Sequence, residues 1–301
     1  MTSAKKSHIK SNLTCMLASL SFAVGFPALE ILLNDWGVIS VVLIRNLIAF
    51  IVILLIWFLI EDYKKILQAD WFKGFIIGAL GFGLGSVLLV VTQFLTTTFI
   101  AALAAALMPL AAIALEIIFD KRQITISFSI GLTLVLIGGI IILGERVIDI
   151  KFNLGLFIGL LSVTFFAWGS RASVKHLPKM TTLGRTATTT FGMSGFCSLI
   201  YIASLYLNLG ATNIPKIEIK HVQLFIIYAG LGLAISQILW IQGVKKLGIG
   251  IASFHLNLTP FYVMIILFII GYDWMWLQAI GALIVITGIS VTQIGPRKAP
   301  L

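Results

Sequence analysis

Charged residues are scarce in this sequence, and their scarcity excludes an ordinary soluble domain. Only 11% of the 301 residues are Asp, Glu, Lys or Arg, whereas 59% are hydrophobic and the mean hydropathy is +1.09. Soluble globular domains contain about 25% charged and about 45–50% apolar residues. The apolar runs are broken by polar clusters about every 20–25 residues, as in helical proteins that cross a membrane several times. A β-barrel would instead alternate in polarity over about ten residues, and no such pattern occurs.

Cysteine and histidine are also rare. Cys15 and Cys197 each lie in an apolar run without metal-ligand spacing or an obvious disulfide partner, so we expect both to be packing residues. Of the four histidines, only His255 lies well inside an apolar run. The sequence contains no His-Glu-x-x-His, phosphate loop, nucleophile elbow or Cys-x-x-Cys motif. We therefore expect no enzyme, and neither catalytic residues, a metal site nor a cofactor.

Acidic residues are outnumbered, with 11 Asp and Glu against 21 Lys and Arg, and the net charge is +10. If the N-terminus is cytoplasmic, 16 of the basic residues fall on the inner side and Arg45 falls within a span. Four fall outside: Arg146, Lys151, Lys216 and Lys220. The positive-inside rule then predicts a multi-pass inner (plasma) membrane protein with both termini in the cytoplasm. Contact with anionic headgroups explains the excess charge better than a nucleic acid does. The expected partners are therefore the lipid bilayer and a small molecule; monomer and homodimer stay open.

Ten apolar runs approach the length of about 20 residues that a bilayer-spanning helix needs. The first follows a basic start without a small-x-small cleavage site, so we expect an uncleaved span rather than a signal peptide. The runs are 11–33, 38–60, 74–92, 99–119, 127–143, 153–172, 186–209, 222–242, 251–270 and 276–294. The expected fold class is an all-α polytopic membrane protein with ten transmembrane helices.

An internal repeat divides these runs into two sets of five. Segments 101–110 and 252–261 share a proline at an offset of 151 residues, Pro109 and Pro260. Further matches follow in the same order at offsets of 144 to 151: Leu80-Gly81 with Leu231-Gly232, Ser86 with Gln237, Gly131 and Gly138 with Gly281 and Gly288, and Ala23-Val-Gly25 with Ala167-Trp-Gly169. Because five is odd, residues 151–301 must enter the membrane from the opposite side to residues 1–150. Two inverted halves are characteristic of transporters with alternating access.

These features together resemble the drug/metabolite transporter superfamily and, within it, the EamA-type ten-helix transporters. The resemblance covers nearly the whole chain. It rests on Pro109-Leu110 after small residues, Thr259-Pro260, Trp168-Gly169, Arg45 at the start of the second span, and the glycine-spaced fifth and tenth spans. Val24-Gly25 departs from the family, in which Trp-Gly is usual. The resemblance implies a central cavity lined by helices 1, 3, 4, 6, 8 and 9, with helices 5 and 10 outside.

The resemblance also implies secondary transport of a small organic metabolite, an amino acid or a related compound, more often exported than imported. Aromatic lining would equally suit uptake of a nucleoside-like metabolite such as S-adenosylmethionine, or a hydrophobic cation. A membrane-embedded enzyme acting on a lipid-linked substrate would need convergent ionisable residues at an interface, and the polar loops here are short and poor in acids. A passive channel would need a continuous polar stripe along several helices, which the spans lack.

Polar and aromatic residues inside the spans are the candidates for substrate binding. They are Ser86, Gln93, Trp168, Gln237, Trp240, His255, Asn257 and Thr259. Gln237 and Trp240 are three residues apart, and His255 and Thr259 are four apart, so each pair shares a helix face. Such groups orient a small organic solute in a mostly apolar cleft. The structural alternative is a set of satisfied hydrogen bonds between helices; His255 could also carry a proton.

Two charges and three prolines stand out within the spans. Glu30 and Arg45 lie near the outer ends of the first two spans. An unpaired charge in the bilayer costs at least about 2.5–3.5 kcal/mol, so we expect the two to pair. The pair could be structural or could bind substrate or protons directly, and both interpretations stay open. Pro27, Pro109 and Pro260 each free a backbone carbonyl and are expected to be hinges, gates or static kinks.

Small residues dominate two neighbouring spans, with five glycines in 74–85 and five alanines in 101–106. Small side chains let helix backbones approach closely in lipid. We expect the third span to pack tightly on the fourth, with space for a ligand beside bare backbone as the alternative.

Overall fold

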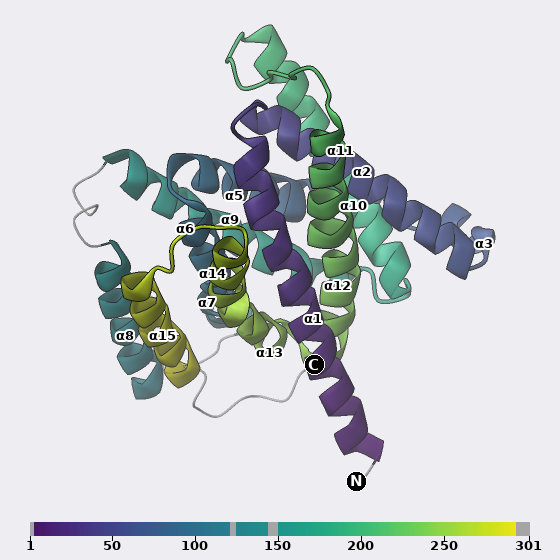
Figure 1. The fold of residues 1–301 in the computed structure, drawn as a ribbon. Coiled ribbons are helices and arrows are strands. Elements are labelled where there is room, and N and C mark those ends of the chain that lie inside the picture. The colour runs from purple at the N-terminus through teal and green to yellow at the C-terminus, as the bar shows by residue number, and fades with distance from the viewer. Residues whose placement is uncertain (1–2, 121–124, 144–149, 293–301) are drawn as a thin grey trace.

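The computed structural model describes residues 3–120, 125–143 and 150–292, and every regular element within them is helical (Figure 1). The first half contains α1 (Ser3–Leu32), α2 (Val38–Ile60), α3 (Tyr63–Leu67), α4 (Trp71–Ile77), η1 (Gly78–Gly83), α5 (Leu84–Leu95), α6 (Thr98–Ala106), α7 (Met108–Asp120) and α8 (Ile126–Leu143). The second half contains α9 (Ile150–His176), α10 (Thr182–Tyr206), α11 (Ile219–Phe225), η3 (Ile226–Ile235), α12 (Ser236–Leu247), α13 (Ile249–Phe254), η4 (His255–Leu258), α14 (Thr259–Ile269) and α15 (Trp276–Thr292).

Within the described ranges, eight helical segments are long and apolar enough to cross a bilayer. They are Ile9–Leu32, Val38–Ile60, Trp71–Leu95, Thr98–Phe119, Ile150–His176, Thr182–Tyr206, Ile219–Leu247 and Ile249–Ile269. The two remaining expected spans correspond to α8 and α15, of 18 and 17 residues. At 1.5 Å per residue they reach about 26–27 Å, less than a hydrocarbon core of about 30 Å. Among the described residues, length and composition therefore support eight candidate spans of the expected ten.

Several spans are not uniform α-helices. Trp71–Leu95 and Ile219–Leu247 each contain a π-helical stretch, η1 and η3, at matching places in the two halves. Thr98–Phe119 breaks at Leu107, just before Pro109, and Ile249–Ile269 contains the 3-10 turn η4 just before Pro260. The breaks expected at these two prolines are therefore present. Pro27, by contrast, lies inside the uninterrupted helix α1.

Contacts between the two halves are reciprocal. Helix α1 packs on η3 and α12, and its counterpart α9 packs on η1 and α5. At the first contact Gly25 meets Gly232, and at the second Gly169 meets Gly81. The repeat relates Gly25 to Gly169 and Gly81 to Gly232. The two contacts between the halves therefore use the same pair of repeat positions. A Cβ atom added at Gly81 would lie 2.5 Å from the Gly169 Cα atom, so only glycine permits this approach.

Helices α8 and α15 lie side by side at one edge of the molecule (Figure 1). Gly131 contacts Gly288, and Gly138 contacts Gly281, so the two helices run antiparallel. Their position away from the centre agrees with the outside location that the family resemblance implies for the fifth and tenth spans.

The glycine-rich face of Trp71–Leu95 differs from the sequence-based expectation. Gly74 and Gly78 contact Thr188 and Thr189 of α10, and Gly85 contacts α9. The alanine-rich helix α6 also contacts α9, where Ala104 meets Gly159. The prediction that the third span packs mainly on the fourth is therefore wrong. Close backbone approach is used mostly to join the two halves.

A polar contact joins the turn after α1 to the chain before α11. The Gly37 amide donates to the Asn213 carbonyl at 2.8 Å. His221 accepts the Glu218 backbone N–H at Nδ1, so its proton lies on Nε2, which is 3.2 Å from the Asp35 carboxylate. The hydrogen bond from His221, followed by that from Lys220, holds the pKa of Asp35 below its ordinary value. The α1–α2 turn is thus fixed to the other half.

Candidate functional site

A cavity of about 50 Å³ lies where the two halves meet. Its walls come from α1, α5, α6 and α7 of the first half, and from α9, α12 and η4 of the second. These elements belong to the six helices that the family resemblance implies around a central cavity. The lining is mainly apolar, with the aromatic rings of Phe22, Phe166 and Trp240 and the polar groups of Ser236 and Gln237.

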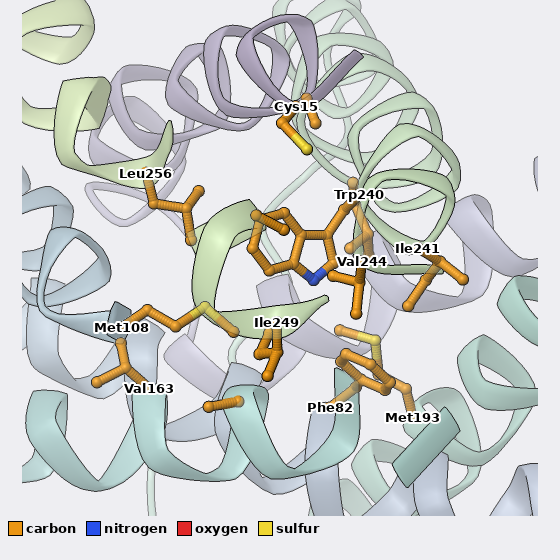
Figure 2. Close-up of a cluster of buried hydrophobic side chains, with 14 of the residues drawn as sticks. Cys15, Phe82, Met108, Val163, Met193, Trp240, Ile241, Val244, Ile249 and Leu256 are labelled. Atoms are coloured by element: carbon orange, nitrogen blue, oxygen red, sulfur yellow. The ribbon is translucent and has the colours of Figure 1, made fainter. Parts of the chain in front are cut away.

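The Trp240 side chain lines this cavity and is held in place by a hydrogen bond. Its indole nitrogen donates to the Ser170 hydroxyl at 2.9 Å, and that hydroxyl donates to the Phe166 carbonyl at 2.7 Å. Figure 2 shows the ring within the central hydrophobic cluster, with Met108 and Leu256 on one side and Val244 on the other. A ring held at its polar edge and packed around its body offers a rigid apolar face to a solute.

Gln237 supplies the main polar group of the cavity. It lies one turn before Trp240 on α12, as the three-residue spacing predicts. The neighbouring hydroxyl of Ser236 instead donates to the carbonyls of Gly232 and Leu233 on its own helix. An amide with both a donor and an acceptor can therefore orient a solute in this otherwise apolar space.

A second, smaller cavity of about 10 Å³ adjoins the first, and both share Phe22 and Leu89 as lining residues. Its polar lining comes from Arg45, Gln93 and Tyr228. It extends along α1 as far as Leu29, so it lies nearer the α1–α2 turn than the first cavity does. We call this second cavity the polar chamber.

Arg45 and Glu30 have separate partners, which corrects the expected ion pair. The Arg45 guanidinium donates to the Asn46 carbonyl oxygen at 2.9 Å and to the Tyr228 hydroxyl at 3.0 Å. The Glu30 carboxylate accepts from the Thr98 hydroxyl, and from the Gln93 amide at 3.3 Å. Sequence spacing placed both charges near the same end of the first hairpin. It could not reveal that other helices satisfy each charge.

The remaining predicted residues lie outside the lining of these two cavities. Ser86 donates to the Gly83 carbonyl and accepts from Asn46. Trp168 packs beside Ile77 and Leu177. His255 is half-buried, with Nδ1 3.3 Å from the Ala252 carbonyl. The structure brings Gln237 and Trp240 together in the first cavity, and Gln93 and Arg45 together in the second. Ser86, Trp168 and His255 line neither cavity.

Asn257 and Thr259 are buried at the helix break and have no hydrogen-bond partner for their side chains. Asn257 lies in η4 and Thr259 begins α14. Almost all buried polar groups in folded proteins are hydrogen-bonded, so two unpaired side chains two residues apart single out this break.

Sequence reasoning missed three aromatic members of the site: Phe22, Phe166 and Tyr228. Phenylalanines are common in every span, so their presence alone carries no signal. Tyr228 was detectable in principle, because a phenol inside an apolar run needs a polar partner, which here is Arg45. Within the described residues, no group of three His, Cys, Asp or Glu side chains is placed to hold a metal ion.

The fold defines a multi-pass helical membrane protein, and its two halves together line a mainly apolar cavity. In sequence comparison, residues 9–144 match the model of the EamA-like transporter family, part of the drug/metabolite transporter superfamily, which confirms the resemblance for that part of the chain. Members of that family are membrane transporters of small molecules.

Solved structures support the fold over the whole chain. Among 26 matching chains, one described only as "Crystal structure of protein" has a TM-score of 0.70 at 15% sequence identity. The match covers 95% of this chain and 96% of that chain, so the two folds are alike from end to end. No curated protein matches the sequence.

Proposed function

We propose that the protein is a secondary transporter that moves a small organic metabolite across the bilayer by alternating access. The observation that carries this proposal is the cavity walled by helices of both halves. Its mainly apolar lining with a few polar groups is typical of small-molecule sites. The family of residues 9–144 supports the same function. An amino acid or a related compound is the substrate, and export is the direction, as the resemblance implies.

The proposed architecture completes ten spans with α8 and α15 and treats residues 1–150 and 151–301 as inverted halves. Its support is the exchange of contacts between repeat-related glycines, such as Gly25 with Gly232 and Gly81 with Gly169. Such an exchange is what a two-fold axis between the halves produces. The 16 to 4 distribution of basic residues supports a cytoplasmic location of both termini, in an inner-membrane protein. Arg146, one of the four outer residues, lies outside the described residues.

In this mechanism the halves rock against each other around the cavity. The breaks before Pro109 and Pro260 lie in its walls, next to Met108 and after Leu256. Segments on either side of such a break can change direction without unfolding a whole helix, because the proline already lacks one helical hydrogen bond. The Trp240 wall remains attached to α9 through Ser170, so α9 and α12 move together.

The test is a matched pair of substitutions on α12. Gln237→Leu removes the amide from the cavity, whereas Gln242→Leu makes the same change on the same helix at a half-buried residue outside the cavity lining. Solutes are first selected from a panel of amino acids, nucleosides and organic cations by thermal stabilisation of the purified protein. Counterflow of each selected solute is then measured in proteoliposomes.

We expect Gln237→Leu to reduce counterflow by up to about tenfold, the effect of losing one hydrogen bond of about 1.4 kcal/mol, with unchanged yield of folded protein. Gln242→Leu should transport like the unmodified protein. If no solute of the panel is carried, or if both variants carry it equally well, the proposed function or its site is wrong. Chemical conversion of a solute without its movement would instead support a membrane-embedded enzyme.

A further inference from the structure

The polar chamber contains one buried donor and one buried acceptor that lack partners. Arg45 is 4% exposed and Gln93 is 3% exposed, and both line the chamber. The Arg45 Nη2 nitrogen and the Gln93 Oε1 oxygen are each buried without a hydrogen bond. A buried polar atom without a partner is costly, so a ligand that pairs with both atoms gains binding free energy here.

The neighbouring groups determine which atoms remain unpaired. The Gln93 amide nitrogen faces the Phe26 carbonyl at 2.9 Å, the Thr98 hydroxyl at 2.9 Å and the Glu30 carboxylate at 3.3 Å. The Thr98 hydroxyl donates to Glu30, so all three neighbours can act only as acceptors toward Gln93. The nitrogen must therefore face them, and Oε1 is left without a partner. Arg45 similarly uses Nε and Nη1 on Asn46 and Tyr228, which leaves Nη2.

The charge of Arg45 indicates the nature of the missing partner. Its two bonded neighbours, Asn46 and Tyr228, are neutral side chains, and the Tyr228 ring also packs against the guanidinium at 4.9 Å. Glu30, the carboxylate that spacing suggested for it, accepts from Thr98 and Gln93 instead. A buried cation held only by neutral groups attracts an anion, and a carboxylate fits a guanidinium especially well.

We propose that the polar chamber binds the head group of the transported solute, and that this head group is a carboxylate with an N–H donor on the adjacent carbon. The carboxylate bonds to Arg45 and the N–H donates to Gln93 Oε1. The apolar body of the solute extends past Phe22 and Leu89, which the two cavities share, and lies against Trp240 and Phe166. This assignment rests on the proposed transport function. It excludes a simple hydrophobic cation, because Arg45 would repel it.

Three probes with one apolar body test the head group: phenylalanine, 3-phenylpropionate, which lacks the amine, and 2-phenylethylamine, which lacks the carboxylate. The measurement is the shift in unfolding temperature of the purified full chain in detergent. Phenylalanine should give the largest shift, 3-phenylpropionate a smaller one, and 2-phenylethylamine none. The inference is overturned if the amine stabilises the protein as well as phenylalanine does, or if neither carboxylate probe stabilises it.

Variants of two buried arginines give the matched control. Arg45→Gln should abolish the shift with phenylalanine. Arg185→Gln should keep it, because Arg185, which is 2% exposed, binds the carbonyls of Leu177 and Pro178 away from both cavities. A phenylalanine shift that survives Arg45→Gln overturns the assignment. If a variant does not fold, the three probes on the unmodified protein still test the head-group assignment.

The outcomes also separate this assignment from the proposed function. Counterflow of 2-phenylethylamine that is lost in Gln237→Leu but retained in Arg45→Gln would refute the head-group assignment and leave transport standing. Binding of phenylalanine that depends on Arg45, without any counterflow of phenylalanine, would refute transport and leave the binding site standing.

Discussion

At the scale of single residues, Asn257 is a buried polar side chain that its surroundings do not stabilise. It is 2% exposed, and neither atom of its amide has a hydrogen-bond partner. Each buried unsatisfied group costs about 1–3 kcal/mol. A residue kept at such a cost in this conformation has a use in another one, where the η4 break changes and the amide finds its partners.

Asn257→Leu is therefore expected to stabilise the protein and impair its function. Leucine has a similar size and removes the unsatisfied amide, so the unfolding temperature in detergent should rise. Counterflow should fall, because the conformation that pairs the amide loses its hydrogen bonds. Thr259→Val gives an independent check at the other unpaired side chain. Faster counterflow, or unchanged counterflow in a stabilised variant, would contradict a role for Asn257 in the transport cycle.

The sequence predicted Gln237 and Trp240 from their helical spacing, and Gln93 and Arg45 as polar residues inside apolar runs. Gln237 and Trp240 line the cavity because a separation of three residues puts them on one face of α12. Spacing does not determine which other helix a face meets. For that reason the partners of Arg45, the unpaired amide of Asn257 and the contribution of Tyr228 came only from the structure.

At the scale of helices, glycine positions determine how closely α8 and α15 approach. A Cβ atom added at Gly138 would lie 2.8 Å from the Gly281 carbonyl oxygen and 2.9 Å from Val285. The next residue, Gly139, would meet nothing within 4 Å. Gly138 and Gly139 are adjacent on one helix, but only Gly138 faces the neighbouring helix α15.

Gly138→Ala is expected to destabilise the protein by about 1–3 kcal/mol, the usual cost of overpacking. Gly139→Ala should be neutral or stabilising by up to about 1 kcal/mol, because alanine favours the helix. Thermal unfolding of both variants in the same detergent measures the difference. Equal unfolding temperatures for the two variants would mean that the α8–α15 contact is looser than the structure indicates.

Helix positions were largely predictable, and helix shapes were not. The apolar runs anticipated the eight described segments that are long enough to cross a bilayer and the two shorter helices α8 and α15, because length and hydrophobicity largely determine them. The breaks at Leu107 and η4 followed from the two prolines. The π-helical stretches η1 and η3 had no sequence signature beyond glycine, and the partners of the glycine-rich face required knowledge of the tertiary packing.

At the scale of the whole molecule, the proposed inverted arrangement places Lys64 and Lys216 on opposite sides of the membrane. Both residues are exposed, and the native cysteines Cys15 and Cys197 are fully buried. A membrane-impermeant maleimide added to intact cells should label Lys216→Cys. It should label Lys64→Cys only after permeabilisation. Labelling of both from the same side would rule out the inverted halves and the alternating-access mechanism based on them.

The polar chamber has no chemical equivalent in the other half. At the repeat offsets of 144 and 151 residues, Arg45 corresponds to Thr189, Gln93 to Val244 and Tyr228 to Ile77, so the charged end of the site exists only on the side of the α1–α2 turn. If the solute binds as we propose, its long axis has one fixed sense relative to the membrane. It would then leave through the face of that turn with its charged end leading and through the opposite face with its apolar end leading. The solute would thus pass the two exits with opposite ends leading, although the two halves share one backbone pattern.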